Sequence, residues 1–308
     1  MTLDQILQQR YNLTSPTQIE LIRKGPDNEV FKIITDSKTL VLRLSRRQIN
    51  NIDFEVEVLS QLYQLGAKVI PPVYTQDNRP YFITDNEQIG TLFPFVSGHH
   101  LEVNKDCKPD LKKVALVAQA FADLHQKGQR LHITYSRART IYTELERILS
   151  HEKLFLSSYK DGREFIAKVK EYLYWARSQS SPQGIIHNDY RPNNVFFNQE
   201  GIEAILDFDW SCSGFLLKDL GLALAEWSYP DGAEGPWADV FDTFYQSYNS
   251  RSSVKYPLDT TLYRWICFAC LSDACTYFSD ILDNNPPHVP QPINSYMLSK
   301  FNFFIKKI

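Results

Sequence analysis

The chain has 308 residues, of which 43% are hydrophobic and 22% charged, and its formal net charge is −3. These values are typical of a folded protein of about two domains. They exclude wholesale disorder and argue against a dedicated nucleic-acid binder. The five cysteines are irregularly spaced, which argues against a disulfide framework and favours a reducing, cytoplasmic location. No apolar run approaches the roughly 18 residues of a membrane span, and the start MTLDQILQQR lacks the features of a signal peptide.

Residues 1–97 have the pattern of a strand-rich lobe. Thr2 and Gln5 have the spacing of a capping box, which predicts a short N-terminal helix. Asp36-Ser37 is typical of a hairpin turn. Runs rich in β-branched and aromatic residues predict strands at Ile19–Lys24, Glu29–Thr35, Lys38–Leu44, Val69–Tyr74, Arg79–Thr84 and Gly90–Val96.

One main helix is predicted in this lobe, over residues 51–66, with Gly66 as its C-cap. Its apolar stripe at helical spacing consists of Ile52, Val56, Leu59 and Tyr63.

Residues 98–308 are mainly helical in pattern, with a β-like interruption at Ile185–Phe208. Asp110 is placed to cap a helix that ends at Gly128, and the proline-rich segment Asn284–Pro292 predicts a surface loop. The apolar positions of the capped helix are Val114, Val117, Phe121 and Leu124. We therefore predict an α+β, bilobal fold with lobes at residues 1–97 and 98–308, joined near residues 94–98.

The segment IIHNDYRPNNVFFNQEGIEAILDFDW, residues 185–210, gathers polar side chains around a predicted hairpin. Two apolar, β-like runs flank a turn at residues 198–201. The hairpin brings Asn194 and Asp207, one at each foot, to the same edge, and Asp189 lies on the loop that leads in. Mg²⁺ prefers such oxygen ligands and usually takes one or two carboxylates plus substrate phosphates.

The spacing His187-x-Asp189-x-x-x-x-Asn194 matches the catalytic loop of protein kinases. Asp207-Phe-Asp occupies the place of their magnesium motif. With KDLGLA at residues 218–223, these motifs make the chain resemble the aminoglycoside phosphotransferase, choline kinase and type II homoserine kinase family over nearly its whole length. The resemblance implies a protein-kinase-like fold, a nucleoside triphosphate as phosphate donor and Mg²⁺ as cofactor.

By the same resemblance, Asp189 would be the catalytic base that accepts the proton of the acceptor hydroxyl. Asn194 and Asp207 would hold Mg²⁺. His187 would brace the catalytic loop, and Asp219 would stabilise it from the following helix. The alternative is a hairpin with coincidental polar residues at its feet.

The resemblance also places a nucleotide site in the N-terminal lobe. Gly25, Asn28 and Val30 belong to the loop expected over the phosphates, for which a plain β-turn is the alternative. Arg43 is the cation expected to bind phosphate, and Glu55 is its expected partner because it shares an inward flank of its helix with apolar residues. The alternatives are an exposed edge-strand arginine and a solvated glutamate.

The linker at residues 93–98 resembles the family's hinge, where the backbone of Phe95 and Val96 would meet the adenine. Its side chains carry no purine signature, so GTP remains an alternative to ATP. No Walker A motif and no G-x-G-x-x-G occurs. We interpret the cysteines at 267, 270 and 275 as core thiols and the histidines at 99, 100 and 125 as surface or packing residues.

Two features bear on the acceptor. Asn188 replaces the loop arginine of protein kinases and no A-P-E motif follows, which favours a small acceptor. The stretch Glu226–Asp283 holds nine acidic and three basic residues with Trp and Tyr between them. This composition suits an amine through charge and cation–π contact; a solvated acidic face over an aromatic core is the alternative.

The leading hypothesis is an ATP- and Mg²⁺-dependent kinase acting on a hydroxyl of a small, amine-bearing molecule such as an aminoglycoside, choline, ethanolamine or a homoserine-like compound. The second is a protein kinase of the same superfamily. The third is a nucleotide-binding module without catalysis, against which the intact Asp189, Asn194 and Asp207 argue. The sequence predicts no nucleic-acid or membrane partner and leaves the oligomeric state open.

Overall fold

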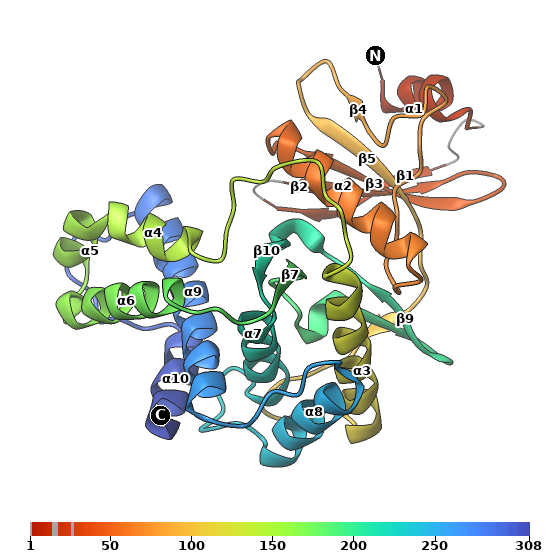
Figure 1. Cartoon of the computed structure of the whole chain (residues 1–308). Coiled ribbons are helices and arrows are strands. Elements are labelled where there is room, and N and C mark those ends of the chain that lie inside the picture. The colour runs from red at the N-terminus through yellow and green to blue at the C-terminus, as the bar shows by residue number, and fades with distance from the viewer. Residues whose placement is uncertain (1, 14–17, 26–27) are drawn as a thin grey trace. The chain divides into compact units, whose positions relative to one another are not determined.

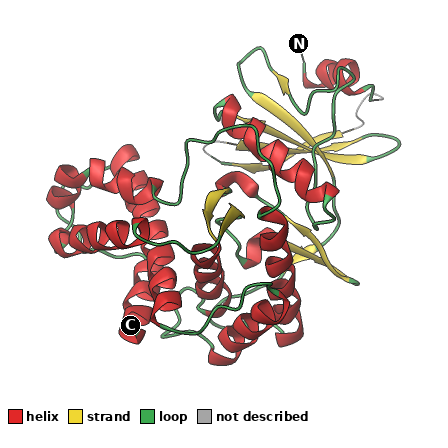
Figure 2. Ribbon diagram, viewed as in Figure 1, coloured by secondary structure: helices red, strands yellow, loops and turns green. Residues whose placement is uncertain are grey.

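The computed structural model describes residues 2–13, 18–25 and 28–308. Its chain divides into two compact units. The first unit comprises Met1–His99, Leu131–Ala138 and Phe196–Leu206, and the second comprises His100–Arg130, Arg139–Val195 and Asp207–Ile308. Most strands belong to the first unit and most helices to the second (Figures 1 and 2). The predicted α+β class is confirmed.

The first unit is built on a five-stranded antiparallel sheet. In the order β1-β2-β3-β5-β4, its strands are Gln18–Lys24, Asn28–Ile34, Thr39–Ser45, Ile89–Pro94 and Phe82–Ile83. In the tight β2–β3 turn the Thr35 hydroxyl accepts the Lys38 N–H at 3.1 Å. Helix α1 (Leu3–Tyr11) begins at the predicted capping box, where the Gln5 N–H donates to Thr2 Oγ1 at 3.3 Å.

Helix α2 spans Ile49–Gln64, and Gly66 follows it in the left-handed conformation (φ +74°), as expected of a residue that ends a helix. The predicted stripe is wrong at Tyr63, whose side chain is 56% exposed. The buried face includes Glu55 and three apolar residues of the next two turns, and Tyr63 lies on its flank in the last turn. Those apolar residues are Val58, Leu59 and Leu62.

Two predicted strands differ from the structure. Residues 69–74 form no strand beyond a single bridge from Val69 to Ile205, because Pro71 and Pro72 in the middle of the run have no N–H to donate to a ladder. The run at Arg79–Thr84 contributes only the two residues of β4, which begins after Pro80.

The predicted hairpin after the catalytic-loop motif is confirmed. Strands β8 (Val195–Asn198) and β9 (Gly201–Ile205) join β6 (His99–His100) in a small sheet ordered β6-β8-β9. The Asn198 side chain shapes the turn, accepting the N–H groups of Glu200 at 2.8 Å and Gly201 at 3.0 Å.

The second unit is mainly helical and carries a short antiparallel pair, β7 (Gln183–Ile186) and β10 (Cys212–Phe215). The predicted helix is α3 (Leu111–Gly128), and Asp110 caps it by accepting the N–H groups of Lys112 and Lys113. The other helices are α4 (Thr143–Ser150), α5 (Glu152–Ser158), α6 (Gly162–Arg177), α7 (Leu216–Ser228), α8 (Ala238–Arg251), α9 (Thr260–Asn284) and α10 (Tyr296–Phe304).

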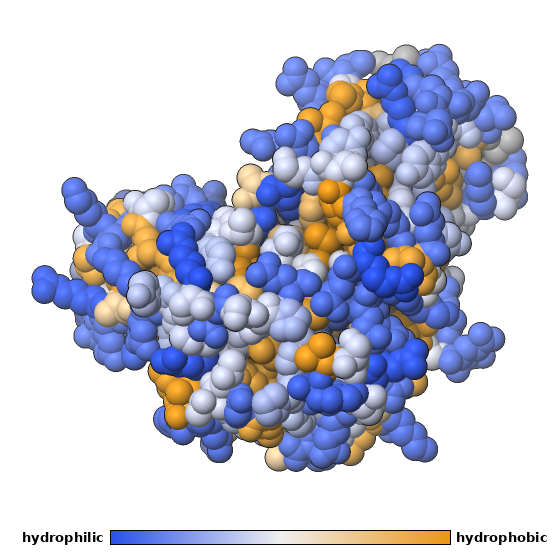
Figure 3. Space-filling model, viewed as in Figure 1, coloured by the Kyte–Doolittle hydropathy of each residue, from blue (hydrophilic) through white to orange (hydrophobic). Residues whose placement is uncertain are grey.

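Helices α7 and α9 lie side by side and pack against each other in this unit (Figure 1). A Cβ at Gly221 would lie 2.8 Å from the Ile266 nitrogen, so a side chain there would push the helices apart. By length and composition α9 could cross a membrane, but 72% of its most apolar window is buried inside the protein, as in a core helix. The face shown in Figure 3 is mainly hydrophilic, with apolar residues scattered over it.

Candidate active site

The catalytic-loop motif follows β7 and is anchored by Asp219 of α7. The Asp219 carboxylate is fully buried and accepts the backbone N–H groups of His187 and Asn188, each at 2.8 Å. His125 Nε2 lies 3.1 Å from the same carboxylate, and His125 Nδ1 lies 2.6 Å from the Tyr248 hydroxyl. Burial by itself raises the pKa of Asp219, but the hydrogen bond from His125 and neighbouring positive charge hold it below its usual value. The predicted stabilising contact is present, and His125 is a packing residue, as predicted.

Asn188 connects this loop to two other segments. Its backbone is left-handed (φ +64°), a conformation that asparagine tolerates better than most residues. Its amide nitrogen donates to the Trp210 carbonyl at 3.1 Å, and its amide oxygen accepts from Lys218. His187 is buried and its Nδ1 accepts the Asp189 N–H at 3.2 Å. The catalytic loop is therefore held by α7, through Asp219 and Lys218, and by the segment that contains Trp210.

Asp189 and Asn194 contact each other directly. The Asn194 amide nitrogen donates to the Asp189 carbonyl at 2.7 Å and to Asp189 Oδ2 at 2.8 Å. Arg191 Nε donates to Asp189 Oδ1 at 2.6 Å. The Asp189 side chain is 15% exposed. Burial raises its pKa from 3.8 to about 7, with the charge of Asp207 adding to the rise and Arg191 opposing it. A carboxyl that titrates near neutrality suits a general base.

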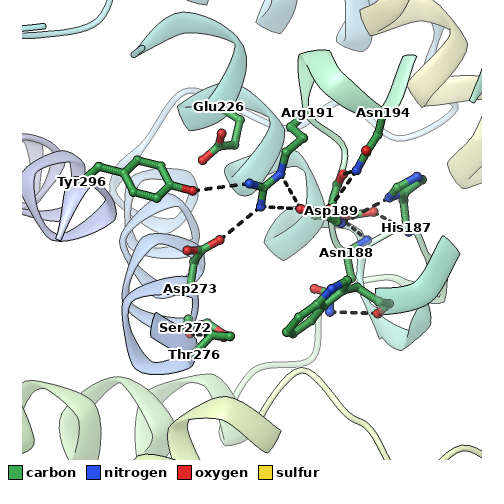
Figure 4. Close-up of polar contacts among 12 residues, drawn as sticks. His187, Asn188, Asp189, Arg191, Asn194, Glu226, Ser272, Asp273, Thr276 and Tyr296 are labelled. Carbon is green, nitrogen blue, oxygen red and sulfur yellow. Dashed lines mark hydrogen bonds and ion pairs between the residues drawn. The ribbon is translucent and has the colours of Figure 1, made fainter. Parts of the chain in front are cut away.

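Arg191 is a hub that the sequence did not reveal (Figure 4). Besides Asp189, its guanidinium donates to Asp273 Oδ2 of α9 at 3.2 Å and to the Tyr296 hydroxyl of α10 at 3.4 Å. Glu226 of α7 lies beside it in Figure 4 and pairs with buried Lys300 at 3.1 Å. The sequence shows only that an arginine follows Asp189 by two residues. The network could not be predicted from this, because the partners Asp273 and Tyr296 lie 82 and 105 positions from Arg191.

Asp207 and Asn194 offer oxygen ligands that fit a hard cation. Asp207 has a left-handed backbone (φ +62°, ψ +66°), and within the described chain its carboxylate has no hydrogen-bond or ion-pair partner. The Asn194 nitrogen is committed to Asp189, which leaves its amide oxygen as a ligand. A carboxylate and an amide oxygen beside bound phosphates match the preference of Mg²⁺. Among the described residues, no group of three or more His, Cys, Asp or Glu side chains has an arrangement that could hold a metal ion without other ligands.

In the first unit, Arg43 and Glu55 form the expected pair. Arg43 lies on the central strand β3, and its two terminal nitrogens donate to the two Glu55 oxygens, both at 2.8 Å. The Arg43 side chain is 12% exposed and the Glu55 side chain 2%. This bidentate, buried geometry excludes an exposed edge-strand arginine and a solvated glutamate.

The remaining nucleotide-site candidates also lie in the first unit. The Gly25 N–H donates to the Asn28 carbonyl at 2.8 Å across the β1–β2 turn, and Val30 pairs with Arg43 in the sheet. Pro26 and Asp27 of the predicted phosphate loop lie outside the described residues. Phe95 and Val96 follow the end of β5 in irregular backbone.

The remaining sequence interpretations agree with the structure fully or in part. The cysteines at 267, 270 and 275 are fully buried, and all five cysteines are free, as predicted. His99 and His100 are exposed. The acidic stretch is mostly a solvated face, but Glu226 and Asp273 join the Arg191 network, and Asp231 lines a cavity of about 430 Å³ with three tyrosines. Those tyrosines are Tyr229, Tyr277 and Tyr296.

Comparison with known proteins finds relatives in sequence and in fold. The chain is 26% identical over 226 residues to a homoserine kinase of Sinorhizobium fredii (strain NBRC 101917 / NGR234), a match over 71% of this chain and 66% of that protein. Its fold is similar to an amicoumacin kinase in complex with AMP-PNP and Ca²⁺, with a TM-score of 0.72, 13% identity, and coverage of 92% of this chain and 94% of the other. It is also similar to a spectinomycin phosphotransferase in complex with ADP and spectinomycin, with a TM-score of 0.65, 16% identity, and coverage of 99% and 93%.

These likenesses confirm the predicted kinase-like fold. The chain spans just under two thirds of the length of the first curated relatives it matches. The model of the phosphotransferase enzyme family, APH, matches residues 18–255. The predicted family is therefore confirmed: this chain belongs to the APH phosphotransferase enzyme family.

Proposed function

We propose that this protein transfers the γ-phosphate of ATP, with Mg²⁺, to a hydroxyl group of a small, amine-bearing molecule. The observation that carries the proposal is Asp189, a mostly buried carboxylate with a pKa near neutrality, held by Asn194 and Arg191 in a loop anchored on Asp219. Such a group can accept a proton at physiological pH while its orientation stays fixed.

In the proposed reaction Asp189 accepts the proton of the acceptor hydroxyl as the hydroxyl oxygen forms a bond to the γ-phosphorus. The proton moves to Oδ1 or Oδ2 of Asp189, and the bond from the γ-phosphorus to the bridging oxygen of ADP breaks. Because Asn194 and Arg191 already hold the carboxylate, little reorganisation is needed at that moment. His187 braces the loop from behind through the Asp189 N–H.

Residues of the first unit are proposed to bind the donor nucleotide. Arg43, oriented by Glu55, would contact the phosphates, and Gly25, Asn28 and Val30 would lie over them. Backbone groups of Phe95 and Val96 would meet the purine, which we take to be adenine. Asn194 and Asp207 would hold Mg²⁺, which supplies charge neutralisation at the transferring phosphate.

The acceptor is proposed to carry an ammonium group. Asp273 and Glu226 lie around Arg191 and are compensated by Arg191 and Lys300 (Figure 4). A ligand ammonium can take the place of the Arg191 guanidinium on Asp273, since both are cationic donors. The cavity near Tyr296 is lined by aromatic rings, Asp231 and Lys300. Because Glu226 compensates the charge of Lys300, the rings and Asp231 favour a cation there. The names of the similar proteins, homoserine, amicoumacin and spectinomycin kinases, agree with an amine-bearing acceptor.

The test is turnover of Mg²⁺-ATP against a panel of hydroxyl compounds: aminoglycosides, choline, ethanolamine, homoserine and sugars. The matched blank is Asp189→Asn, which keeps the size and shape of the side chain. We expect one or more amines to give turnover that is absent in the blank. ATP hydrolysis equal in both proteins for every acceptor would refute the proposal.

A further inference from the structure

The segment Leu131–Ala138, here called the strap, lies along α2 although it follows α3 in sequence. It has no helix or strand of its own and most of its residues are exposed. By its contacts it belongs to the first unit. The strap therefore brings a part of the chain far from α2 in sequence to the helix that carries Glu55.

Two side chains of α2 hold the strap by five hydrogen bonds. Glu57 accepts the N–H groups of Thr134 at 2.8 Å and Tyr135 at 3.2 Å, and the Thr134 hydroxyl at 2.9 Å. Gln61 forms a reciprocal pair with His132: its amide nitrogen donates to the His132 carbonyl at 2.8 Å, and its oxygen accepts the His132 N–H at 3.0 Å. Most of these bonds reach the strap backbone, so they depend on its path more than on its side chains.

The strap is hydrogen-bonded to the face of α2 opposite Glu55. Residues two apart on a helix point in nearly opposite directions, whereas residues four apart share a face. Glu57 and Gln61 therefore lie together on the outer side, while Glu55 points inward to Arg43. The first residue of α2 is preceded by Gln48, which makes no side-chain capping bond. A helix held on both faces cannot roll without breaking either the strap bonds or the Arg43–Glu55 pair.

We propose that Glu57 and Gln61 are positioning residues that, through the strap, fix the rotation of α2 and so hold Arg43 in its phosphate-binding orientation. The inference deepens the proposed function and rests on it for the role of Arg43. The bidentate geometry tolerates little error: both Arg43–Glu55 distances are 2.8 Å, and a small roll of the helix lengthens at least one of them. The strap thus acts on nucleotide binding without touching the nucleotide.

The test compares Glu57→Ala with Gln64→Ala, an exposed position on the same helix. Glu57→Ala should weaken Mg²⁺-ATP binding about 10-fold by calorimetry, a typical coupling for residues in one network, and raise the KM for ATP while the KM for the acceptor stays constant. Gln64→Ala should match the wild type. Glu57→Gln, which keeps one acceptor oxygen, should lie between them. Equal affinity in Glu57→Ala and Gln64→Ala would overturn the inference.

A double-mutant cycle separates positioning from general destabilisation. In a Glu55→Gln background the Arg43 pair is already weakened, so Glu57→Ala should add little further loss of ATP affinity. A loss of full size in both backgrounds would mean that Glu57 does not act through Glu55. If Glu57→Ala does not fold, Gln61→Ala serves in its place with the same expectations.

Hydrogen exchange keeps the test independent of the proposed function. Amides of α2 should exchange at least about 10-fold faster in Glu57→Ala than in Gln64→Ala. If neither the wild type nor any variant binds ATP, the proposed function fails. Hydrogen exchange would then still test whether the strap positions α2, because unchanged protection of the α2 amides in Glu57→Ala would overturn that role.

Discussion

Replacing Asp189 by asparagine should make the protein more stable at pH 8 while abolishing most of its activity. The structure raises the pKa of Asp189 from 3.8 to about 7. In the unfolded chain the pKa of the carboxyl stays near its usual value of 3.8. Between about pH 4 and pH 7 the folded state therefore binds more protons than the unfolded state. The stabilisation that protonated Asp189 gives is complete below about pH 4 and is lost as the pH rises through about 7.

The size of the effect follows from the shift. About 3 pK units at 1.36 kcal/mol each amount to about 4 kcal/mol, the cost of holding the ionised carboxylate in its folded site. Asparagine resembles the protonated acid in shape and charge, so Asp189→Asn should gain about 2–4 kcal/mol relative to wild type at pH 8 and about zero at pH 4. For a chain of 308 residues the gain corresponds to a rise in Tm of roughly 3–6 °C.

The assay is thermal unfolding by circular dichroism at pH 4, 6 and 8 without metal or nucleotide, with Asp242→Asn, an exposed position on α8, as the control. Turnover should fall about 10²–10⁴-fold in Asp189→Asn, the usual range for a general base. A stability difference that stays constant from pH 4 to pH 8, or a variant less stable than wild type at pH 8, would refute the reasoning about the buried charge. Near wild-type turnover would refute the catalytic role.

Four further predictions concern single side chains. Asp207→Ala should abolish Mg²⁺-dependent ATP binding in calorimetry with little change in Tm, because its carboxylate has no partner among the described residues; retained Mg²⁺ dependence would contradict the metal assignment. Arg43→Lys should weaken ATP binding about 10-fold, because lysine cannot form the bidentate pair with Glu55. Asp273→Asn should raise the KM of amine acceptors about 10-fold and leave the KM of ATP unchanged, as measured by steady-state kinetics. Asp219→Asn should destabilise the fold by about 2–4 kcal/mol near pH 7 and by less in acid, because the lowered pKa of Asp219 gives stability that is present above its unfolded value and lost as the pH falls; equal losses at pH 3 and 7 would count against it.

Local signals in the sequence were sufficient for the elements that short-range chemistry determines. The capping box at Thr2, the cap at Asp110 and the turn at residues 198–201 all occur as predicted, because each depends on side chains within a few residues of the backbone they bond. The predicted strand at Val69–Tyr74 is wrong because β-propensity was counted without the missing N–H groups of its two prolines.

Only those residues of the candidate site that belong to a short sequence motif could be predicted. Asp189, Asn194 and Asp207 lie within 19 positions of each other, so one hairpin brings them together. Arg191 has partners on α9 and α10, and His125 meets Asp219 across 94 positions. Such contacts depend on how helices pack, which no local pattern encodes.

Two residues of the site have the same unusual backbone and different surroundings, and the difference separates structure from function. Asn188 and Asp207 are both left-handed, at a cost of about 1–2 kcal/mol for a residue other than glycine. At Asn188 the chain offsets this cost itself: Asp219 accepts its N–H, and Lys218 and the Trp210 carbonyl bond its side chain. At Asp207 no described side chain bonds the carboxylate, although its charge acts on Asp189. We infer that the backbone of Asn188 serves the fold, whereas that of Asp207 presents its carboxylate for the Mg²⁺ proposed above.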